Sequence, residues 1–433
     1  MRSSRKDVWL VGVALFAMFF GAGNLIFPPY LGLLAGSDWR WALLGFLITG
    51  IGMPLLGIIA AARAGGTVEH MGRRVSPLFG RLLAIVILLA IGPLLAIPRT
   101  GAAAFELGVQ PTWPAFPAAV FSVVYFGLTL WFALNRSTVV DRIGRFLTPL
   151  LLIALAWIVL EGLLRPLGAP VRTELPGPFG RGFREGYQTM DALASLVFSQ
   201  IVIGALVLKG YEEPRQQARL AAYAGLVAAL GLALVYGGLM HLGATASGRY
   251  PPDAERTALL IGIVQAQMGG TGRVALGLAV SLACLTTAIA LTATVADYFS
   301  RLCGERLGYR SIAVATVVFS GLFATVGVTT IVNLAYPLLV TVYPVAITLI
   351  VLTLIGGRAT RRAVCVGAVA GALLTSIPEA LAIAGLPLDA LNAVLARLPF
   401  AASGFAWLLP AIVGGLAGLA VAERGTNAGA RPA

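Results

Sequence analysis

Long apolar runs alternate with short polar segments along this 433-residue chain. Each run holds about 20 predominantly apolar residues, the length that a helix needs to cross a bilayer. The pattern predicts twelve membrane spans, near residues 8–34, 40–62, 81–105, 115–134, 140–164, 185–208, 217–243, 274–299, 311–329, 331–355, 363–384 and 403–422. Because no polar linker or low-complexity segment separates the runs, we expect a single membrane domain over residues 1–433.

The first run is interrupted by residues that disfavour regular helix. Its centre reads FFGAGNLIFPPYLG, from Phe19 to Gly32, and contains glycines, an asparagine and two adjacent prolines. Backbone groups that lose their helical partners are costly in hydrocarbon, so a break persists only where protein, an ion, a ligand or water replaces those partners. The stretch therefore predicts a binding site within the membrane.

The sixth run also carries polar residues at depth. It reads EGYQTMDALASLVFSQIVIGALVLKG and contains Gln188, Asp191, Ser195 and Ser199, whose spacing of three or four places them on one face of a continuous helix. An ionisable residue inside a membrane is a candidate functional residue, because its burial is costly without a partner. The alternative is that Asp191 lies at the outer interface and is solvated there.

The two irregular spans each begin a group of five. Residues 1–165 and 183–356 would then form two inverted repeats of opposite orientation, followed by two further spans in residues 357–433. In such a fold the broken helices meet near the membrane midplane, where substrate binds. Free N–H groups at the start of the second half-helix suit an anionic group, and free carbonyls before the break suit a cation. The pattern therefore predicts a cation-coupled carrier for a small zwitterion.

Composition and charge agree with a membrane carrier. The chain is 58% apolar and 11% charged, with a mean hydropathy of +0.90, whereas ordinary soluble domains carry about 25% charged residues. The net charge of +13 does not indicate nucleic-acid binding, because the cations lie in short clusters between apolar runs. With the N-terminus inside, 21 of the 31 Lys and Arg fall on the inner side, which predicts that both termini are cytoplasmic.

Other interpretations of the chain are less consistent with its sequence. The basic and apolar N-terminus is not expected to be a cleaved signal, since the apolar run continues through LIFPPYLGLLA without a cleavage site. A membrane enzyme would need a catalytic motif such as HExxH or GxSxG, and a channel would need a filter or a polar pore. The three cysteines, Cys284, Cys303 and Cys365, have no metal-site spacing and predict no disulfide framework.

Five ordered motifs resemble one bacterial family. They are FFGAGNLIFPP, GPLLAIPRTGAAAFE from Gly92, DRIGRFLTPLLL from Asp141, GYQTMDALASLVF from Gly186 and ACLTTAIAL from Ala283. Together they resemble the branched-chain amino acid:cation symporters, the LIVCS or BrnQ carriers, over essentially the whole chain. This resemblance implies an all-α, LeuT-like fold of 12 transmembrane helices, with a five-plus-five inverted repeat, broken helices 1 and 6, and two extra C-terminal helices.

The resemblance also implies a function. It predicts uptake of leucine, isoleucine and valine with sodium, by alternating access, in the bacterial inner membrane, with no cofactor beyond the coupling ion. The alternative is a proton-coupled carrier of the same fold for other neutral amino acids. Partners other than substrate, ion and lipid bilayer are not implied, and the oligomeric state is left open.

Site residues follow from matching these motifs to the LeuT-like pattern. The sodium site would use carbonyls of Ala17, Phe20 and Ala283 and hydroxyls of Thr286 and Thr287, which as oxygen ligands suit a hard cation. The substrate residues are the backbone of Ala22, Gly23 and Asn24 for the carboxylate, and Tyr187, Thr189, Met190 and Asp191 around the ammonium and side chain. Span 6 lacks the glycine-rich turn of LeuT, so the position of its break is left open by about one turn.

Two further features each allow more than one interpretation. Arg99 lies within the third span and can pair with Glu106, with Asp191 or with a carbonyl, while Pro93 and Pro98 before it flank an expected kink, for which simple helix packing is the alternative explanation. Gly414 and Gly418 form a GxxxG pair in the last span, which suits either close helix packing or a dimer contact.

Overall fold

The computed structural model describes residues 2–134, 147–304, 306–401 and 404–428, and within these ranges the chain is all-helical. The first part contains α1 (Arg2–Phe19), α2 (Ala22–Ala35), η1 (Gly36–Asp38), α3 (Trp39–Leu47), η2 (Ile48–Gly52), α4 (Met53–Arg63), α5 (Val68–Gly72), α6 (Pro77–Leu89), η3 (Ala90–Leu94), α7 (Ala96–Ala103), η4 (Ala104–Val109), α8 (Ala118–Ala133) and α10 (Thr148–Leu164). The second part contains α11 (Pro178–Tyr187), α12 (Asp191–Leu208), α13 (Pro214–Thr245), α14 (Arg256–Leu302), α15 (Tyr309–Ala324), α16 (Val328–Ile355), η7 (Gly357–Thr360), α17 (Arg362–Ile383), α18 (Asp389–Leu395) and α19 (Leu408–Ala428). The first half of the motif that starts at Asp141, residues 141–146, lies outside the described residues.

The helices have the length and surface of membrane spans. Among the described residues, seven helical stretches are long and apolar enough to cross a bilayer and four shorter helices are also apolar, so the class is confirmed while the count of twelve stays a prediction. Large apolar side chains are exposed on the outside, including Val123 (75%), Leu164 (76%) and Leu234 (77%). Their exposure suits contact with lipid tails rather than with water.

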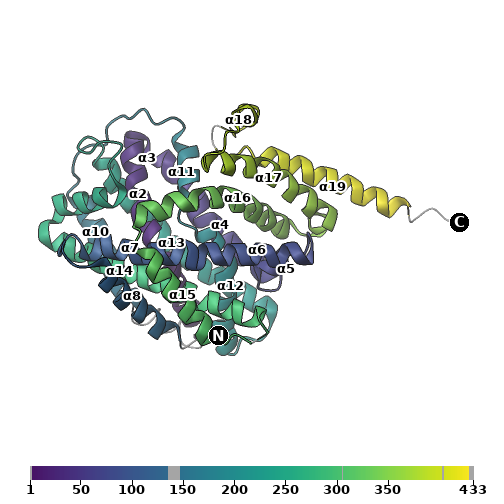
Figure 1. Ribbon diagram of the computed structural model, residues 1–433, viewed down its shortest axis with the longest axis horizontal. Coiled ribbons are helices and arrows are strands. Elements are labelled where there is room, and N and C mark those ends of the chain that lie inside the picture. Colours follow the sequence, from purple (N-terminus) through teal and green to yellow (C-terminus); the bar gives the residue numbers. More distant parts are fainter. Residues whose placement is uncertain (1, 135–146, 305, 402–403, 429–433) are drawn as a thin grey trace.

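Two helix pairs, α1/α2 and α11/α12, are the broken helices that the fold requires. The long helix α13 packs along α1 and α2, and α14 packs against both as well (Figure 1). The third span is also irregular, because π-helical turns flank α7 and Gly92 has a non-helical backbone (φ −93°, ψ −125°) beside Pro93. The kink expected around Arg99 is thus confirmed, and the centre of the molecule collects several interrupted helices.

Helices α17 and α19 lie side by side at one edge of the molecule (Figure 1). Their backbones touch at glycines: a methyl group on Gly414 would come within 2.0 Å of the Gly367 carbonyl oxygen, and one on Gly418 within 2.1 Å of the Ala363 carbonyl oxygen. The GxxxG pair therefore serves close packing inside one chain, and this face is not open to a dimer partner.

Replacing Gly414 by Ala should destabilise the protein, because the added methyl group overlaps the α17 backbone and overpacking costs about 1–3 kcal/mol. The melting temperature of the purified protein in detergent measures the effect. Gly415→Ala is the matched control, since its methyl group would meet Ala368 Cβ at an ordinary 3.4 Å. Equal melting temperatures for the two variants would contradict this packing.

Candidate functional site

The first membrane span is broken between α1 and α2, where Phe20 and Gly21 are not helical. Gly21 has an extended backbone (φ −114°, ψ −162°), and its N–H donates to Asn24 Oδ1 at 3.0 Å. The side chain of Asn24 thus caps the start of α2. The break predicted in this stretch is confirmed.

The carbonyl end of α1 meets two hydroxyl groups of α14. The last carbonyls of a helix have no intrahelical partner. Thr286 Oγ1 lies 2.7 Å from the Ala17 oxygen and 2.9 Å from the Ala283 oxygen, within donating distance of either. Thr287 Oγ1 donates to the Met18 oxygen at 3.0 Å. Four of the five residues predicted for the ion site therefore lie at one helix crossing.

Two details of this crossing differ from the prediction or go beyond it. The carbonyl beside Thr287 belongs to Met18, which the sequence analysis missed, although every carbonyl in the last turn of a broken helix is a candidate. Phe20 is fully buried and its N–H donates to the Phe16 oxygen at 2.8 Å, so the use of its own carbonyl stays a prediction. Gly21 is tightly placed here, because a methyl group on it would come within 3.0 Å of Thr287 Oγ1.

The sixth span breaks at Gln188–Met190, between α11 and α12. Met190 has a left-handed backbone (φ 65°), which is uncommon for a residue other than glycine. The expectation that Gln188 shares a helical face with Asp191 and Ser195 is wrong, because the chain leaves the helix after Tyr187. The break lets the carbonyls of α11 and the first residue of α12 face the centre of the molecule.

Asp191 is at the heart of a buried polar cluster. It is only 3% exposed, and its Oδ2 accepts hydrogen bonds from Asn24 Nδ2 at 2.6 Å and from the Tyr236 hydroxyl at 3.2 Å. The Asn24 amide also contacts the Tyr236 hydroxyl. Asp191 is therefore not solvated at an interface, and the cluster links both helix breaks to α13. Tyr236 is not among the residues predicted from the sequence. Its one signal there is a tyrosine hydroxyl within an apolar run.

Arg99 of α7 is the second buried charge at the centre. It is 4% exposed, and its guanidinium donates to the Gln188 oxygen at 2.6 Å and to the Thr189 oxygen at 3.4 Å. It also lies over the Phe27 ring, 5.7 Å from its centroid. Of the partners considered from sequence, a carbonyl is the one that the structure shows. Arg99 thus bonds the unwound segment between α11 and α12. We call this segment the helix 6 break, because it interrupts the sixth span, and we call the gap between α1 and α2 the helix 1 break.

A cavity of about 20 Å³ lies between the two breaks. Its lining residues come from six helical elements and from the breaks of the first and sixth spans: Met18, Phe19, Gly21, Ala22, Asn24, Ile91, Ala96, Arg99, Thr100, Thr189, Met190, Asp191, Ala194, Phe198, Thr287 and Leu291. Because one water needs roughly 10–15 Å³ by this measure, the cavity has room for about one water. A larger ligand can enter only if the surrounding helices move apart.

Most of the predicted substrate residues line this cavity, but two do not. Gly23 lines a second, smaller cavity, together with Arg99 and Arg256. Tyr187 lies in a stack with Tyr343, with ring centroids 4.4 Å apart and an interplanar angle of 27°. These two residues therefore lie outside the lining of the central cavity.

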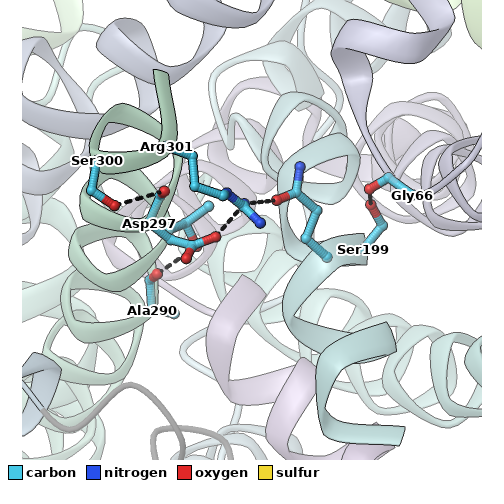
Figure 2. A network of polar contacts seen from close by, with 8 residues as sticks. Gly66, Ser199, Ala290, Asp297, Ser300 and Arg301 are labelled. Atoms are coloured by element: carbon cyan, nitrogen blue, oxygen red, sulfur yellow. Dashed lines mark hydrogen bonds and ion pairs between the residues drawn. The ribbon is translucent and has the colours of Figure 1, made fainter. Parts of the chain in front are cut away.

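A polar network joins α12 to its neighbours away from the cavity, further along α12 (Figure 2). Ser199 donates to the Gly66 oxygen at 3.1 Å, and Arg301 Nη2 donates to Gln200 Oε1 at 2.8 Å. Arg301 also pairs with Asp297 one turn earlier in α14. In this conformation the second half of helix 6 is therefore tied to α14 and to the segment before α5.

Comparisons with known proteins agree with this arrangement. Residues 4–424 match the family model described as branched-chain amino acid transport protein. The chain is 40% identical to the branched-chain amino acid permease BraB of Bacillus subtilis, with 95% of each chain covered. It is 39% identical to the branched-chain amino acid transport system 3 carrier protein of Pseudomonas aeruginosa and 35% identical to the permease BrnQ of Escherichia coli K12, with 94% of each chain covered.

Solved structures of other transporters share the fold. A Na⁺-coupled sialic acid symporter gives a TM-score of 0.62 at 13% identity, with 95% of this chain and 89% of that chain covered. Mhp1, a nucleobase-cation-symport-1 family transporter, gives 0.60 at 13% identity, with 96% and 92% covered. The manganese transporter of Eremococcus coleocola gives 0.59 at 15% identity, with 95% and 94% covered. These neighbours confirm the predicted LeuT-like architecture.

Replacing Asn24 by Ala should lower stability, because it leaves the Gly21 N–H and the buried Asp191 without the amide that joins them. An unsatisfied buried group costs about 1–3 kcal/mol, and the melting temperature in detergent measures the loss. Asn333→Ala is the matched control, since Asn333 is exposed on α16. An equal change at both positions would contradict the structural role of the cluster.

Proposed function

Because this chain belongs to the branched-chain amino acid transport protein family, we propose that it takes up leucine, isoleucine and valine by sodium-coupled symport with alternating access. It is a multi-pass membrane transporter and not an enzyme. Relatives named as branched-chain amino acid permeases and carriers support the substrate class. Their bacterial sources support a place in the bacterial inner membrane, and the charge pattern supports cytoplasmic termini.

One observation carries the proposal: two broken helices face a single cavity and present groups of opposite polarity to it. The end of α1 presents carbonyls beside threonine hydroxyls, and the first N–H groups of α2 have no intrahelical partner, as at the start of any helix. A carboxylate and a cation can therefore bind next to each other, where each lowers the cost of burying the other. This is the basis for coupling the two.

The amino acid backbone would bind across the cavity. The N–H groups of Ala22, Gly23 and Asn24 at the start of α2 suit the carboxylate, and Asp191 suits the ammonium. Arg99 Nε is buried without a hydrogen-bond partner among the described residues, and a methyl group on Gly23 would lie 3.0 Å from Arg99 Nη2. A carboxylate beside Gly23 would therefore gain a charge-assisted hydrogen bond as well.

The side chain of the substrate would face the apolar part of the lining, which includes Ile91, Phe198 and Leu291. Thr189 and Met190 border it from the helix 6 break, with Tyr187 beyond them. A hydrophobic pocket discriminates by only about 1–3 kcal/mol per methylene. Overlapping use of leucine, isoleucine and valine is therefore expected.

Sodium would bind at the crossing of α1 and α14. The oxygens of Ala17, Phe20 and Ala283 and the hydroxyls of Thr286 and Thr287 form a set of the type that hard cations prefer. A hydroxyl that donates to a carbonyl can rotate its proton away and offer a lone pair to an ion. Binding would pull α1 and α14 together next to the substrate.

Alternating access would open the small cavity to each side in turn. The left-handed Met190 and the extended Gly21 are the points where each broken helix can bend. The contact of Arg301 with Gln200 would have to open when α12 moves away from α14 (Figure 2). Binding energy from substrate and sodium would bias this equilibrium between conformations.

A proton-coupled carrier for other neutral amino acids is the second candidate. It is favoured by the burial of Asp191, a carboxyl group held between the amide of Asn24 and the hydroxyl of Tyr236. A carboxyl at this position could take up and release a proton during transport. The two candidates differ in which ion gradient drives uptake.

Uptake of labelled leucine into proteoliposomes should require an inward sodium gradient, because the ion and the carboxylate are proposed to bind side by side. Unlabelled isoleucine and valine should compete, since the apolar lining discriminates only weakly among the three branched side chains. Lysine and glutamate should not compete. Equal uptake with a pH gradient in the absence of sodium would reassign the carrier as proton-driven.

Replacing both Thr286 and Thr287 by Ala should raise the half-saturating sodium concentration by about tenfold or more, because two oxygen ligands worth on the order of 1 kcal/mol each are lost. Initial rates of leucine uptake against sodium concentration measure this. Thr294→Val is the matched control, since that hydroxyl is buried in the same helix and bonds only to the Ala290 oxygen at 2.7 Å. An unchanged sodium dependence in a folded double variant would remove the proposed ion site.

A further inference from the structure

The two helix breaks satisfy their free carbonyls in different ways. At the helix 1 break, the carbonyls of Ala17 and Met18 meet neutral hydroxyl groups. At the helix 6 break, the carbonyls of Gln188 and Thr189 accept hydrogen bonds from the guanidinium of Arg99. A hydroxyl can turn to admit a cation, whereas a guanidinium is itself a permanent cation with donors only.

Arg99 is held firmly in this position. Its side chain is buried, its guanidinium lies against the Phe27 ring, and a methyl group added to Gly23 would lie 3.0 Å from its Nη2. The same guanidinium therefore touches the start of α2 and the end of α11. A mobile cation could not bind to the helix 6 carbonyls without displacing it.

Charge balance leads to the same conclusion. Arg99 and Asp191 are the two charged side chains among the residues that line the central cavity. Their charges compensate each other, and a zwitterionic substrate adds no net charge. One coupling cation brings the buried site to a single positive charge, and a second would add a like charge close to Arg99 in a medium of low dielectric, where repulsion is strong.

We propose that Arg99 is a resident cation of the helix 6 break, so that the carrier binds and moves one coupling cation per amino acid. The inference rests on the proposed sodium-coupled transport, because carbonyl and hydroxyl oxygens at the helix 1 break suit a metal cation. Arg99 supplies in every state the positive charge that the helix 6 carbonyls and Asp191 would otherwise draw from solution. The single mobile cation then binds at the helix 1 break.

The number of cations can be measured on the unmodified protein. In proteoliposomes with the membrane potential clamped at zero, opposing gradients of leucine and of the driving cation are adjusted until net flux stops. For one cation the balancing leucine gradient equals the cation gradient, and for two it equals the square of that gradient. The equality is expected. A squared relation would overturn this inference while leaving sodium coupling intact, whereas a flux that does not depend on sodium would overturn the proposed function itself.

Removing the guanidinium should change the number of bound ions. Arg99→Gln leaves the site with the negative charge of Asp191 and with free carbonyls at Gln188 and Thr189, so we expect a second sodium to bind. The rise of melting temperature with the logarithm of sodium concentration gives this number without requiring transport, since its slope scales with the number of ions bound. The slope should about double in the variant.

Two further variants separate this role from a merely structural one. Arg256→Gln is the matched control, because Arg256 lies over the same Phe27 ring, 5.2 Å from its centroid, but pairs with Glu185 at 3.8 Å instead of bonding to the break. Its slope should equal that of the unmodified protein. Arg99→Ala should regain stability and leucine binding with guanidinium ion in the buffer. An unchanged slope in Arg99→Gln, or the same doubling in Arg256→Gln, would overturn the proposal.

Discussion

A backbone that leaves the helix inside a membrane must find new partners for its N–H and C=O groups, and the centre of this protein is built around that requirement. Two helices break next to each other, where Asn24 bonds to Asp191, and each break frees several such groups. The partners come from distant parts of the chain. Hydroxyls of α14 meet the end of α1, the amide of Asn24 closes the start of α2, and the guanidinium of Arg99 closes the end of α11.

These partners differ in how easily they can be exchanged. A threonine hydroxyl carries no net charge and can rotate, so under the proposed function the helix 1 break would accept an ion and release it again. A buried guanidinium is charged, planar and held by two carbonyls, and its loss would leave those carbonyls unpaired in the membrane. The site thus combines one exchangeable position with one fixed position. The proposed symport would use such a division, since the ion would leave with the substrate while the framework stays in place.

The small volume of the cavity follows from the same contacts between the two breaks. Its volume of about 20 Å³ means that the two breaks, the Asp191 cluster and Arg99 are in contact almost directly. A ligand that separates them must replace the hydrogen bonds that it interrupts, and an amino acid carries the charges needed to do so. Helix packing around the site cannot deform continuously, so movement is concentrated at the breaks and at the contact between α12 and α14.

The sequence alone determined the class and the two irregular spans, because these depend on local features: apolar length and helix-breaking residues. The ion residues came from the family resemblance and stay a prediction, although four of the five lie at one helix crossing. The tertiary structure decided which groups meet. In the structure, Gln188 lies outside the helix that carries Asp191, and Tyr187 stacks on Tyr343. Met18 and Tyr236 contribute contacts that were not predicted, and Arg99 bonds to backbone carbonyls. Asn24 and Asp191 are 167 residues apart, and Thr286 and Ala17 are 269 apart. Contacts over such separations follow from how helices pack in three dimensions, and no periodicity along the chain encodes them.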